Sequence, residues 1–352
     1  MSINTNVPDI SIQITDSIHK IQAEEWNALA GGRPFQSYAW YRFAEKVMLE
    51  SGCRSIYLLS YRDGILTGRA SLWVVPNEPI TYPGSWRLLL KPVLRKFPLL
   101  ICRSPFSNTS GLIAPDQETL ASLIAAAIQQ GRQRGCLALI LDYLSKADAA
   151  NIPPGLSIEE MPNPGTVLAN SWNSFDGYLS RGNKKDRQHY KRVVRKANEL
   201  GVQVKQETCA RDVDAIACMV ESTERKYGSE PNPWTKGLLA HMDMVGGILL
   251  LATREGEITG CGLLFEDNGA QLATALGHAQ SNDYTYFLLA YTGIELAMAQ
   301  GVKALRWGSG AYDVKRRLGF LPEDNGRYAF TFTHPLVTRI EDGLKWVRKL
   351  TD

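Results

Sequence analysis

The sequence of 352 residues has few cysteines, and no pair of them is spaced as a ligand set. The six cysteines include no CxxC pair and lie near no histidine cluster, so we predict neither a metal site nor a disulfide framework, and a reduced, cytoplasmic setting fits. No run of about 18 apolar residues occurs, and the first residues lack a basic segment followed by an apolar core. We therefore expect neither a transmembrane segment nor a signal peptide.

Strong charge of one sign is also missing. The formal net charge is only +3, which by itself does not indicate a nucleic-acid partner, so any such argument depends on where the charges lie. The composition, 44% hydrophobic and 21% charged, is typical of a globular protein, and the length is enough for two domains.

An internal repeat is present. Residues 56–73 align without gaps on residues 248–265, and both copies read as two strands joined by a short turn that contains glycine. Residues 127–141 resemble residues 293–307 in the same way. The offsets, 192 and 166, differ by 26, which predicts an insertion in the first copy near residues 77–112. The sequence thus predicts a duplicated α/β domain.

The boundary between the two copies is expected in a turn-rich stretch with several prolines and glycines. We place it after residue 165, so that residues 1–165 form the first domain and residues 166–352 the second. The inserted segment 86–101 mixes apolar and basic residues. It could rest on an anionic membrane surface, but its two prolines favour a loop packed on its own domain.

The most charged stretch covers residues 181–198, within a predicted basic helix of residues 181–200. It carries eight cations and one acid, and its apolar residues recur at helical spacing, so we predict a helix with one packed face and one strongly positive face. Two interpretations stay open. The positive face is either simply solvated or docks a polyanion such as an RNA backbone or a nucleotide-linked donor.

Residues 277–320 read as a helix between two strands, followed by a turn and a basic segment. Ser281, Asn282 and Asp283 are suited to cap the helix start, and Gly301 to end it. A helix N-terminus next to a basic turn is typical of a half-site for a phosphorylated ligand.

At this point the chain resembles a known family. The segment 172–180, the basic helix after it, the hairpin 248–265 and the stretch 286–320 are similar to the FemAB-like branch of the GNAT acyltransferase superfamily. The resemblance covers residues 172–332 well and residues 12–143 more weakly. It implies an α/β (α+β) fold of two tandem GNAT-like domains, each with a mixed, mostly antiparallel sheet flanked by helices, the first one degenerate.

The resemblance also implies a reaction, the transfer of an acyl or aminoacyl group onto an amine of a small-molecule or cell-wall-type acceptor. The donor would be an acyl thioester such as acyl-CoA, or aminoacyl-tRNA, with no tightly bound cofactor. No nucleophile signature is present, so we expect direct transfer without a covalent enzyme intermediate. The alternative is a non-catalytic nucleotide- or RNA-binding protein on the same fold.

Two departures from the superfamily pattern stand out. The usual glycine-rich pyrophosphate loop is replaced by residues 278–286, with only Gly277 before them, which puts standard CoA binding in doubt. Near the end, Lys315 stands where ordinary members often have a tyrosine, and Tyr312 is offset by three.

Site residues follow from these motifs. Tyr312 is the candidate general acid, Asp313 would orient it or the amine, and Lys315 would stabilise the leaving group. Tyr227 and Trp234 lie on a proline-containing loop that suits either a substrate wall or a rigid packing turn. Trp307 is the third substrate-binding candidate. The donor-binding candidates are His278, Tyr284, Tyr286, Arg316, Arg317, Lys184 and Arg187.

Overall fold

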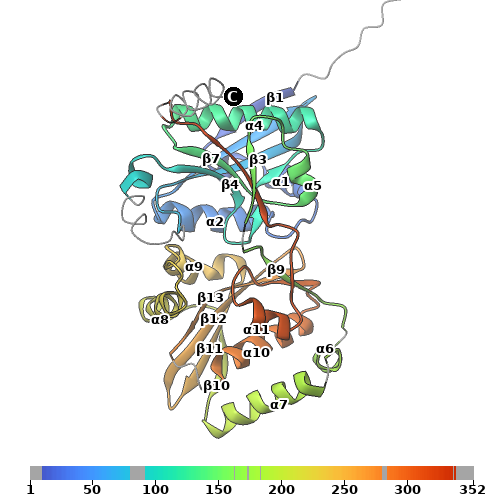
Figure 1. Cartoon of the computed structure of the whole chain (residues 1–352), viewed down its shortest axis with the longest axis vertical. Coiled ribbons are helices and arrows are strands. Elements are labelled where there is room, and N and C mark those ends of the chain that lie inside the picture. The colour runs from blue at the N-terminus through green and yellow to red at the C-terminus, as the bar shows by residue number, and fades with distance from the viewer. Residues whose placement is uncertain are drawn as a thin grey trace, which may run out of the picture. The chain divides into compact units, whose positions relative to one another are not determined.

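The chain forms two compact units in a computed structural model that describes residues 10–79, 92–161, 163–172, 174–182, 184–279, 284–335 and 337. Figure 1 shows the elements of both units. The first unit comprises Met1–Glu78, Tyr82–Pro162 and Asn325–Asp352, and the second comprises Pro79–Thr81 and Asn163–Asp324. Among the described residues, none of the helices is both long and apolar enough to cross a bilayer.

The first unit is built on a sheet in the order β1-β2-β3-β4-β7-β16-β8, with the short β5 and β6 paired to β4 and β3. The pairing of β4 with β7 is parallel and the other described pairings are antiparallel. Its strands are β1 (Ile10–Thr15), β2 (Arg54–Arg62), β3 (Ile65–Val75), β4 (Leu99–Ser104), β5 (Thr109–Ser110), β6 (Leu112–Ile113), β7 (Ala138–Leu144), β8 (Ser157–Glu160) and β16 (Arg327–Phe332).

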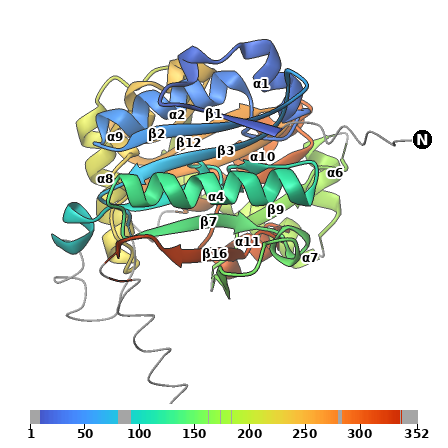
Figure 2. The ribbon, with the colours of Figure 1, turned by 90° about the horizontal axis from the view of Figure 1, so that it is seen from above.

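Helices cover both faces of this sheet (Figure 2). One face packs against α4 (Gln117–Gln133) and the other against α1 (Ala23–Ala30) and α2 (Tyr38–Glu50), while α5 (Lys146–Ala150) follows β7. The aromatic residues Trp26, Trp40 and Phe43 are fully buried on the α1 and α2 side, as their helical spacing predicts.

The second unit repeats this plan with the order β10-β11-β12-β13-β14-β9-β15. Again one pairing, β13 with β14, is parallel and the other described pairings are antiparallel. Its strands are β9 (Thr166–Ala169), β10 (Gln203–Glu207), β11 (Ile248–Arg254), β12 (Glu257–Asp267), β13 (Ala270–His278), β14 (Ala304–Arg306) and β15 (Leu321–Pro322).

Helix α8 packs on β13 from one side of the second sheet, and α10 packs on β11 and β12 from the other, with α7 against α10. The helices are α6 (Phe175–Ser180), α7 (Lys184–Glu199), α8 (Val213–Lys226), α9 (Thr235–Ala240), α10 (Thr285–Ala299) and α11 (Tyr312–Arg317). Two mixed, mostly antiparallel sheets flanked by helices confirm the predicted fold class.

The end of the chain lies in a different unit from the one predicted. Strand β16 pairs with β7 and β8, so the residues from Asn325 onward belong to the first unit, whereas the sequence placed all of 166–352 in the second domain. The physical reason is that β16 covers the open edge of β7, and its Ala329 is buried in the first core.

The repeat is visible in the packing of two glycines. A Cβ added at Gly68 in β3 would lie 2.6 Å from Thr119 Cγ2, and one added at Gly260 in β12 would lie 2.4 Å from Thr285 Cγ2. In each unit a threonine in the first turn of the following helix therefore sits directly on a strand glycine. The two glycines are 192 residues apart and the two threonines 166 residues apart, which are the offsets of the two aligned segments.

The insertion in the first copy is split between two places. One part is the long connection from Val75 to Leu99, and the other is the loop between β4 and β6, which carries β5. Of the inserted segment 86–101, residues 86–91 lie outside the described residues, and Leu99 to Ile101 form the buried start of β4. This part is neither a loop nor a membrane contact, because it pairs with β3 and β7 inside the sheet.

Candidate donor site in the second unit

The second sheet opens where β13 and β14 diverge. Their parallel pairing covers Ala270–Leu272 and Ala304–Arg306, and β13 then continues to His278 with no further strand on its β14 side among the described residues. An unpaired strand edge offers backbone N–H and C=O groups to an extended ligand. The part of β13 beyond Leu272 is therefore a candidate edge for pairing with a linear ligand.

Strand β13 is also bent inside this opening. Its register with β12 shifts between Cys261 and Leu263, and Ala275 has a positive φ of 49°, which is uncommon for a residue other than glycine. This is the geometry of a β-bulge, a feature often found beside active sites because it redirects the local backbone.

Helix α10 begins just past the open strand. Its N-cap residue, Tyr284, is in the left-handed region with a φ of 61° and makes no side-chain cap hydrogen bond. The first N–H groups of a helix lack partners within the helix and attract anions. The predicted caps Ser281, Asn282 and Asp283 lie outside the described residues.

His278 brings three predicted donor and substrate residues together at the end of β13. Its Nε2 lies 3.5 Å from the hydroxyl oxygen of Tyr227, and its ring lies 6.4 Å from the ring of Tyr286. Burial and the nearby Tyr227 raise the pKa of Tyr286 to about 12. Thr223 of α8 holds the strand end, because its Oγ1 accepts from the His278 N–H at 3.0 Å. We found no sequence signal for this role of Thr223.

The side chains of Lys315 and Tyr312 both donate hydrogen bonds to backbone carbonyl oxygens. The buried Lys315 Nζ donates to the carbonyl oxygens of Trp307, Gly308 and Ser309, and the Tyr312 hydroxyl donates to Pro164 O at 2.6 Å. Burial lowers the pKa of Lys315 to about 8. The ammonium thus fixes the turn that leads from β14 into α11.

The remaining predicted residues divide into buried and exposed groups. Trp234 and Trp307 are buried, and the Trp307 ring packs 4.7 Å from Phe320, so their rings fill the core. Tyr227, by contrast, is 64% exposed. Asp313 is almost fully exposed and lies 3.8 Å from the guanidinium of Arg316.

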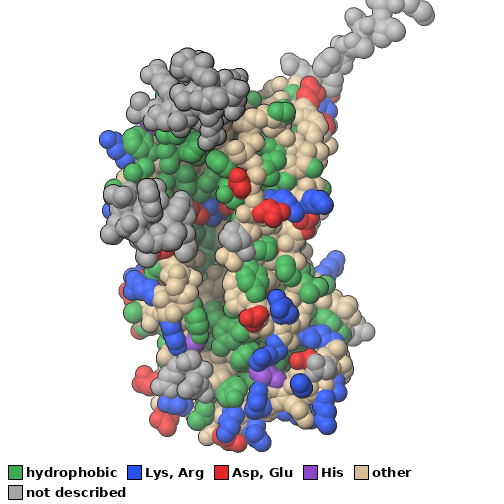
Figure 3. Space-filling model, viewed as in Figure 1, with side chains coloured by type: hydrophobic (Ala, Val, Ile, Leu, Met, Phe, Trp, Pro, Cys, Tyr) green, Lys and Arg blue, Asp and Glu red, His purple; other side chains and the backbone are tan. Residues whose placement is uncertain are grey.

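Basic side chains line one surface of the second unit. In Figure 3, lysines and arginines gather over the region where Figure 1 shows α7. Lys184, Arg187 and Arg192 of α7 are exposed, as are Arg316 and Arg317 of α11. Burial, and then the cations Arg317 and Arg192, lower the pKa of His189, whose Nδ1 lies 3.0 Å from the Tyr291 hydroxyl. The basic side of α7 therefore extends toward α11.

The first unit has the same two structural positions, but fills them with its own charges. At the start of α4, the Asp116 side chain accepts from the Thr119 N–H at 2.8 Å and lies 3.1 Å from Arg62 Nη1. The Thr119 N–H is the main reason that the pKa of Asp116 is below its usual value. A carboxylate of the protein thus occupies the place where a bound anion would sit.

Directly after the parallel segment of β4 and β7, a buried ion pair joins the two strands. Arg103 Nη2 lies 3.3 Å from Asp142 Oδ2 and 2.6 Å from Glu78 Oε1. The corresponding place in the second unit is the opening beside β13. The two units therefore differ at this place, where the first has a buried ion pair and the second has an unpaired stretch of β13.

Known structures share this fold at low sequence identity. FemX has a TM-score of 0.63 at 13% identity, covering 94% of this chain and 100% of its own. A tandem GNAT protein from the clavulanic acid biosynthesis pathway has a TM-score of 0.57 at 14% identity, covering 93% and 99%. The C-terminal domain of a putative lysylphosphatidylglycerol synthetase from Agrobacterium fabrum has 0.54 at 9%, covering 92% and 95%.

No curated protein matches the chain by sequence. The profile of the FemAB-like family, described as peptidoglycan biosynthesis/recognition, matches residues 17–351. Since this match spans both units, and the tandem GNAT fold agrees with it, the chain belongs to the FemAB-like family.

Proposed function

We propose that the protein is an N-acyltransferase that moves an acyl or aminoacyl group from an activated donor onto an amine of a cell-wall-type acceptor. Membership of a peptidoglycan biosynthesis/recognition family and the GNAT-like fold support a transferase of this class. The observation that carries the proposal is the contrast between the two helix starts. Asp116 fills the anion position at α4, whereas Tyr284, the N-cap residue of α10, makes no cap hydrogen bond with its own side chain.

In this proposal the donor binds along the second unit. Its phosphate groups lie at the start of α10, beside His278 and Tyr286, and its acyl arm follows the open edge of β13. The exposed cations of α7 and α11, among them Lys184, Arg187 and Arg317, attract the rest of an anionic donor through long-range electrostatics.

The chemistry requires an uncharged amine, a polarised carbonyl and a proton for the leaving atom. A C–N bond forms while the C–O or C–S bond to the donor breaks, and the proton lost by the attacking nitrogen passes to the leaving oxygen or sulfur. Because all three N–H bonds of the Lys315 ammonium have carbonyl acceptors nearby, we assign to Lys315 a fixed positive charge that stabilises the leaving group rather than a proton transfer.

Tyr312 then has a different role from that of a general acid. Its hydroxyl proton is used in the bond to Pro164 O, which ties the start of α11 to the segment before β9. We propose that it positions α11, and therefore Lys315. We propose that the exposed carboxylate of Asp313 contacts the incoming amine.

The test is product formation with a panel of donors and acceptors. The full chain is incubated with acetyl-CoA, a longer acyl-CoA or aminoacyl-tRNA, each with amino-sugar or peptide acceptors from cell-wall precursors, and the products are measured by mass spectrometry. Transfer from one donor class supports the proposal. Saturable donor binding with no product from any pair would contradict it and favour a non-catalytic recognition protein.

A further inference from the structure

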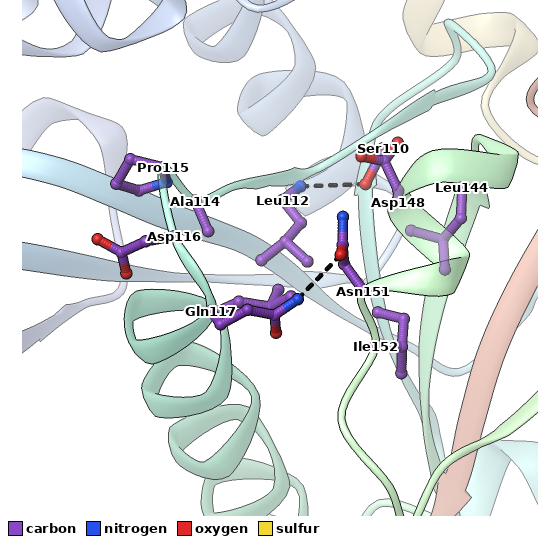
Figure 4. Close-up of a pocket in the computed structure, with 11 residues that line it drawn as sticks. Ser110, Leu112, Ala114, Pro115, Asp116, Gln117, Leu144, Asp148, Asn151 and Ile152 are labelled. Carbon is purple, nitrogen blue, oxygen red and sulfur yellow. Dashed lines mark hydrogen bonds between the residues drawn. The ribbon is translucent and has the colours of Figure 1, made fainter.

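A separate pocket lies in the first unit, at the start of α4 (Figure 4). It is open to solvent and has a volume of about 280 Å³. Two stretches of chain line it, one running from β5 into α4 and the other from the end of β7 through α5. The lining residues are Ser110, Leu112, Ala114, Pro115, Asp116, Gln117, Leu120, Leu144, Asp148, Asn151 and Ile152.

Within the repeat, this pocket is the counterpart of the candidate donor site. A Cβ added at Gly68 would lie 3.1 Å from the carbonyl oxygen of Ile113, and one added at Gly260 would lie 3.2 Å from that of Gly277. Ile113 and Gly277 thus hold equivalent positions. Ala114 then corresponds to His278, and the small alanine side chain leaves space where the second unit has an imidazole.

The charge of the pocket is opposite to that of a phosphate site. Its lining contains the carboxylates of Asp116 and Asp148, and none of the eleven lining residues is a lysine, arginine or histidine. Asp116 already neutralises the positive end of α4 and lies 3.1 Å from Arg62 Nη1, so Asp148 is the carboxylate that a cationic ligand would meet. The hydrogen bonds that Asp148 accepts from Ser145 both use Oδ2, so that Oδ1 is available to a ligand.

Below this acidic rim the walls are apolar. Leu120 and Leu144 belong to the core of the first unit, and Leu112 and Ile152 pack against that core. Gln117 and Asn151 are joined across the rim by a 2.9 Å hydrogen bond (Figure 4). A suitable occupant has a short aliphatic stem for the walls and a cationic head for the carboxylates.

We propose that this pocket binds a primary alkylammonium group, such as the end of an aminoalkyl side chain. The binding is independent of the transferase activity proposed above, because it needs neither a donor nor the second unit's site. In this proposal, the position equivalent to the candidate donor site takes a ligand of the opposite charge.

The experiment compares two probes with the same stem and opposite charges, n-pentylammonium and pentanoate. Each is titrated into the isotopically labelled full chain, and backbone amide shifts are followed by NMR. We expect pentylammonium to bind with a dissociation constant on the order of millimolar, to shift the amides of residues 110–120 and 144–152, and to weaken at higher salt. Pentanoate should shift none of these amides.

Three variants locate the effect. Asp148→Asn keeps the side chain's shape and should weaken pentylammonium binding about three- to five-fold. Asn151→Lys places a competing ammonium at the rim and should abolish it. Asp16→Asn removes an exposed carboxylate paired with Lys20 elsewhere in the unit and should change nothing. Equal binding of both probes, amide shifts confined to other regions, or full affinity in Asp148→Asn would overturn the proposal.

Discussion

The two units share their packing positions and differ at the two places where a GNAT-like sheet can hold a donor. Both place a helix threonine on a strand glycine, at Gly68 and at Gly260. At the helix start, however, the first unit has the capping carboxylate of Asp116 and the second has Tyr284, whose side chain makes no cap hydrogen bond. Residues that hold the layers together have stayed alike, while residues that would face a ligand have diverged.

The two units also differ where the parallel pairing of their central strands ends. Arg103 and Asp142 close the ends of β4 and β7 with a buried ion pair, whereas β13 and β14 separate after Leu272. In the first unit the Arg103–Asp142 pair therefore fills the place that corresponds to the unpaired edge of β13. The two copies of the duplication have diverged at this place.

The largest effect is expected from Lys315→Met, which removes the fixed charge proposed for the second unit. We expect kcat to fall about 100- to 1000-fold, the usual range for losing one group that stabilises charge in the transition state. Donor affinity measured by titration should change little. Lys205→Met, at an exposed lysine of β10, serves as the control, and an equal loss of kcat in both variants would rule out the assignment.

The next effect concerns the glycines that the units have in common. Gly260→Ala and Gly68→Ala should each lower the free energy of unfolding by about 1–3 kcal/mol, because the new methyl group collides with a threonine. Denaturant titration measures this loss. Gly262→Ala on the same strand as Gly260 has only an ordinary 3.5 Å contact with Leu276 and should be far milder.

Second-site changes sharpen this test. Thr285→Ser removes the Cγ2 atom and should restore most of the stability lost in Gly260→Ala, and Thr119→Ser should do the same for Gly68→Ala. If only one of the two pairs responds, the packing of the repeat is not equivalent in the two units.

Tyr284→Asp would place a carboxylate at the start of α10, as Asp116 does at the start of α4. Aspartate tolerates the left-handed conformation of this position, and its carboxylate should occupy the anion position of α10. We expect donor affinity to fall about ten-fold while thermal stability is kept. Tyr284→Asn, which matches aspartate in size without adding a charge, is the matched control and should retain more affinity. Equal affinity of the aspartate variant and the natural protein would argue against phosphate binding here.

In the first unit, removing the capping carboxylate of Asp116 should lower the free energy of unfolding. Asp116→Ala removes the cap of α4 and should cost about 1 kcal/mol of unfolding free energy. Asp116→Asn retains a capping oxygen and should cost less, as measured by urea denaturation. If the alanine variant were as stable as the natural protein, the cap would not explain why this carboxylate fills the position.

The last effect is a pH dependence from Lys315. Burial holds its folded pKa at about 8, below the ordinary lysine value, so between pH 8 and about 10.4 the unfolded chain binds more protons than the folded one. Stability should therefore rise with pH through this window and the rise should be absent in Lys315→Met. The charge itself is lost above pH 8, so the kcat of the natural protein should decline there. A flat kcat profile up to pH 10 would contradict the role given to the ammonium.

Much of the fold could be predicted from the sequence, because apolar spacing and glycine positions record packing. The repeat, the basic helix α7 and the helix before β14 follow from these patterns. The return of β16 to the first sheet did not, since a short strand at a chain end gives no sign of which sheet edge it will pair with.

The candidate site could be predicted only in part. The motif near Lys315 indicated a lysine with a special role, but its bonds to Trp307, Gly308 and Ser309 depend on the turn that the chain forms there. Trp234 and Trp307 were expected to face a substrate, and their burial depends on tertiary packing that aromatic residue type alone does not specify.

The central claim is that the donor binds at the second helix start and not at the first. Hydrogen exchange of backbone amides, measured with and without saturating acetyl-CoA and aminoacyl-tRNA, tests it directly. We predict that one of these donors slows exchange at residues 284–288 in the first turn of α10 and leaves residues 117–120 of α4 unchanged. Protection at the start of α4 instead, or of neither helix while the donor is shown to be bound, would contradict the account.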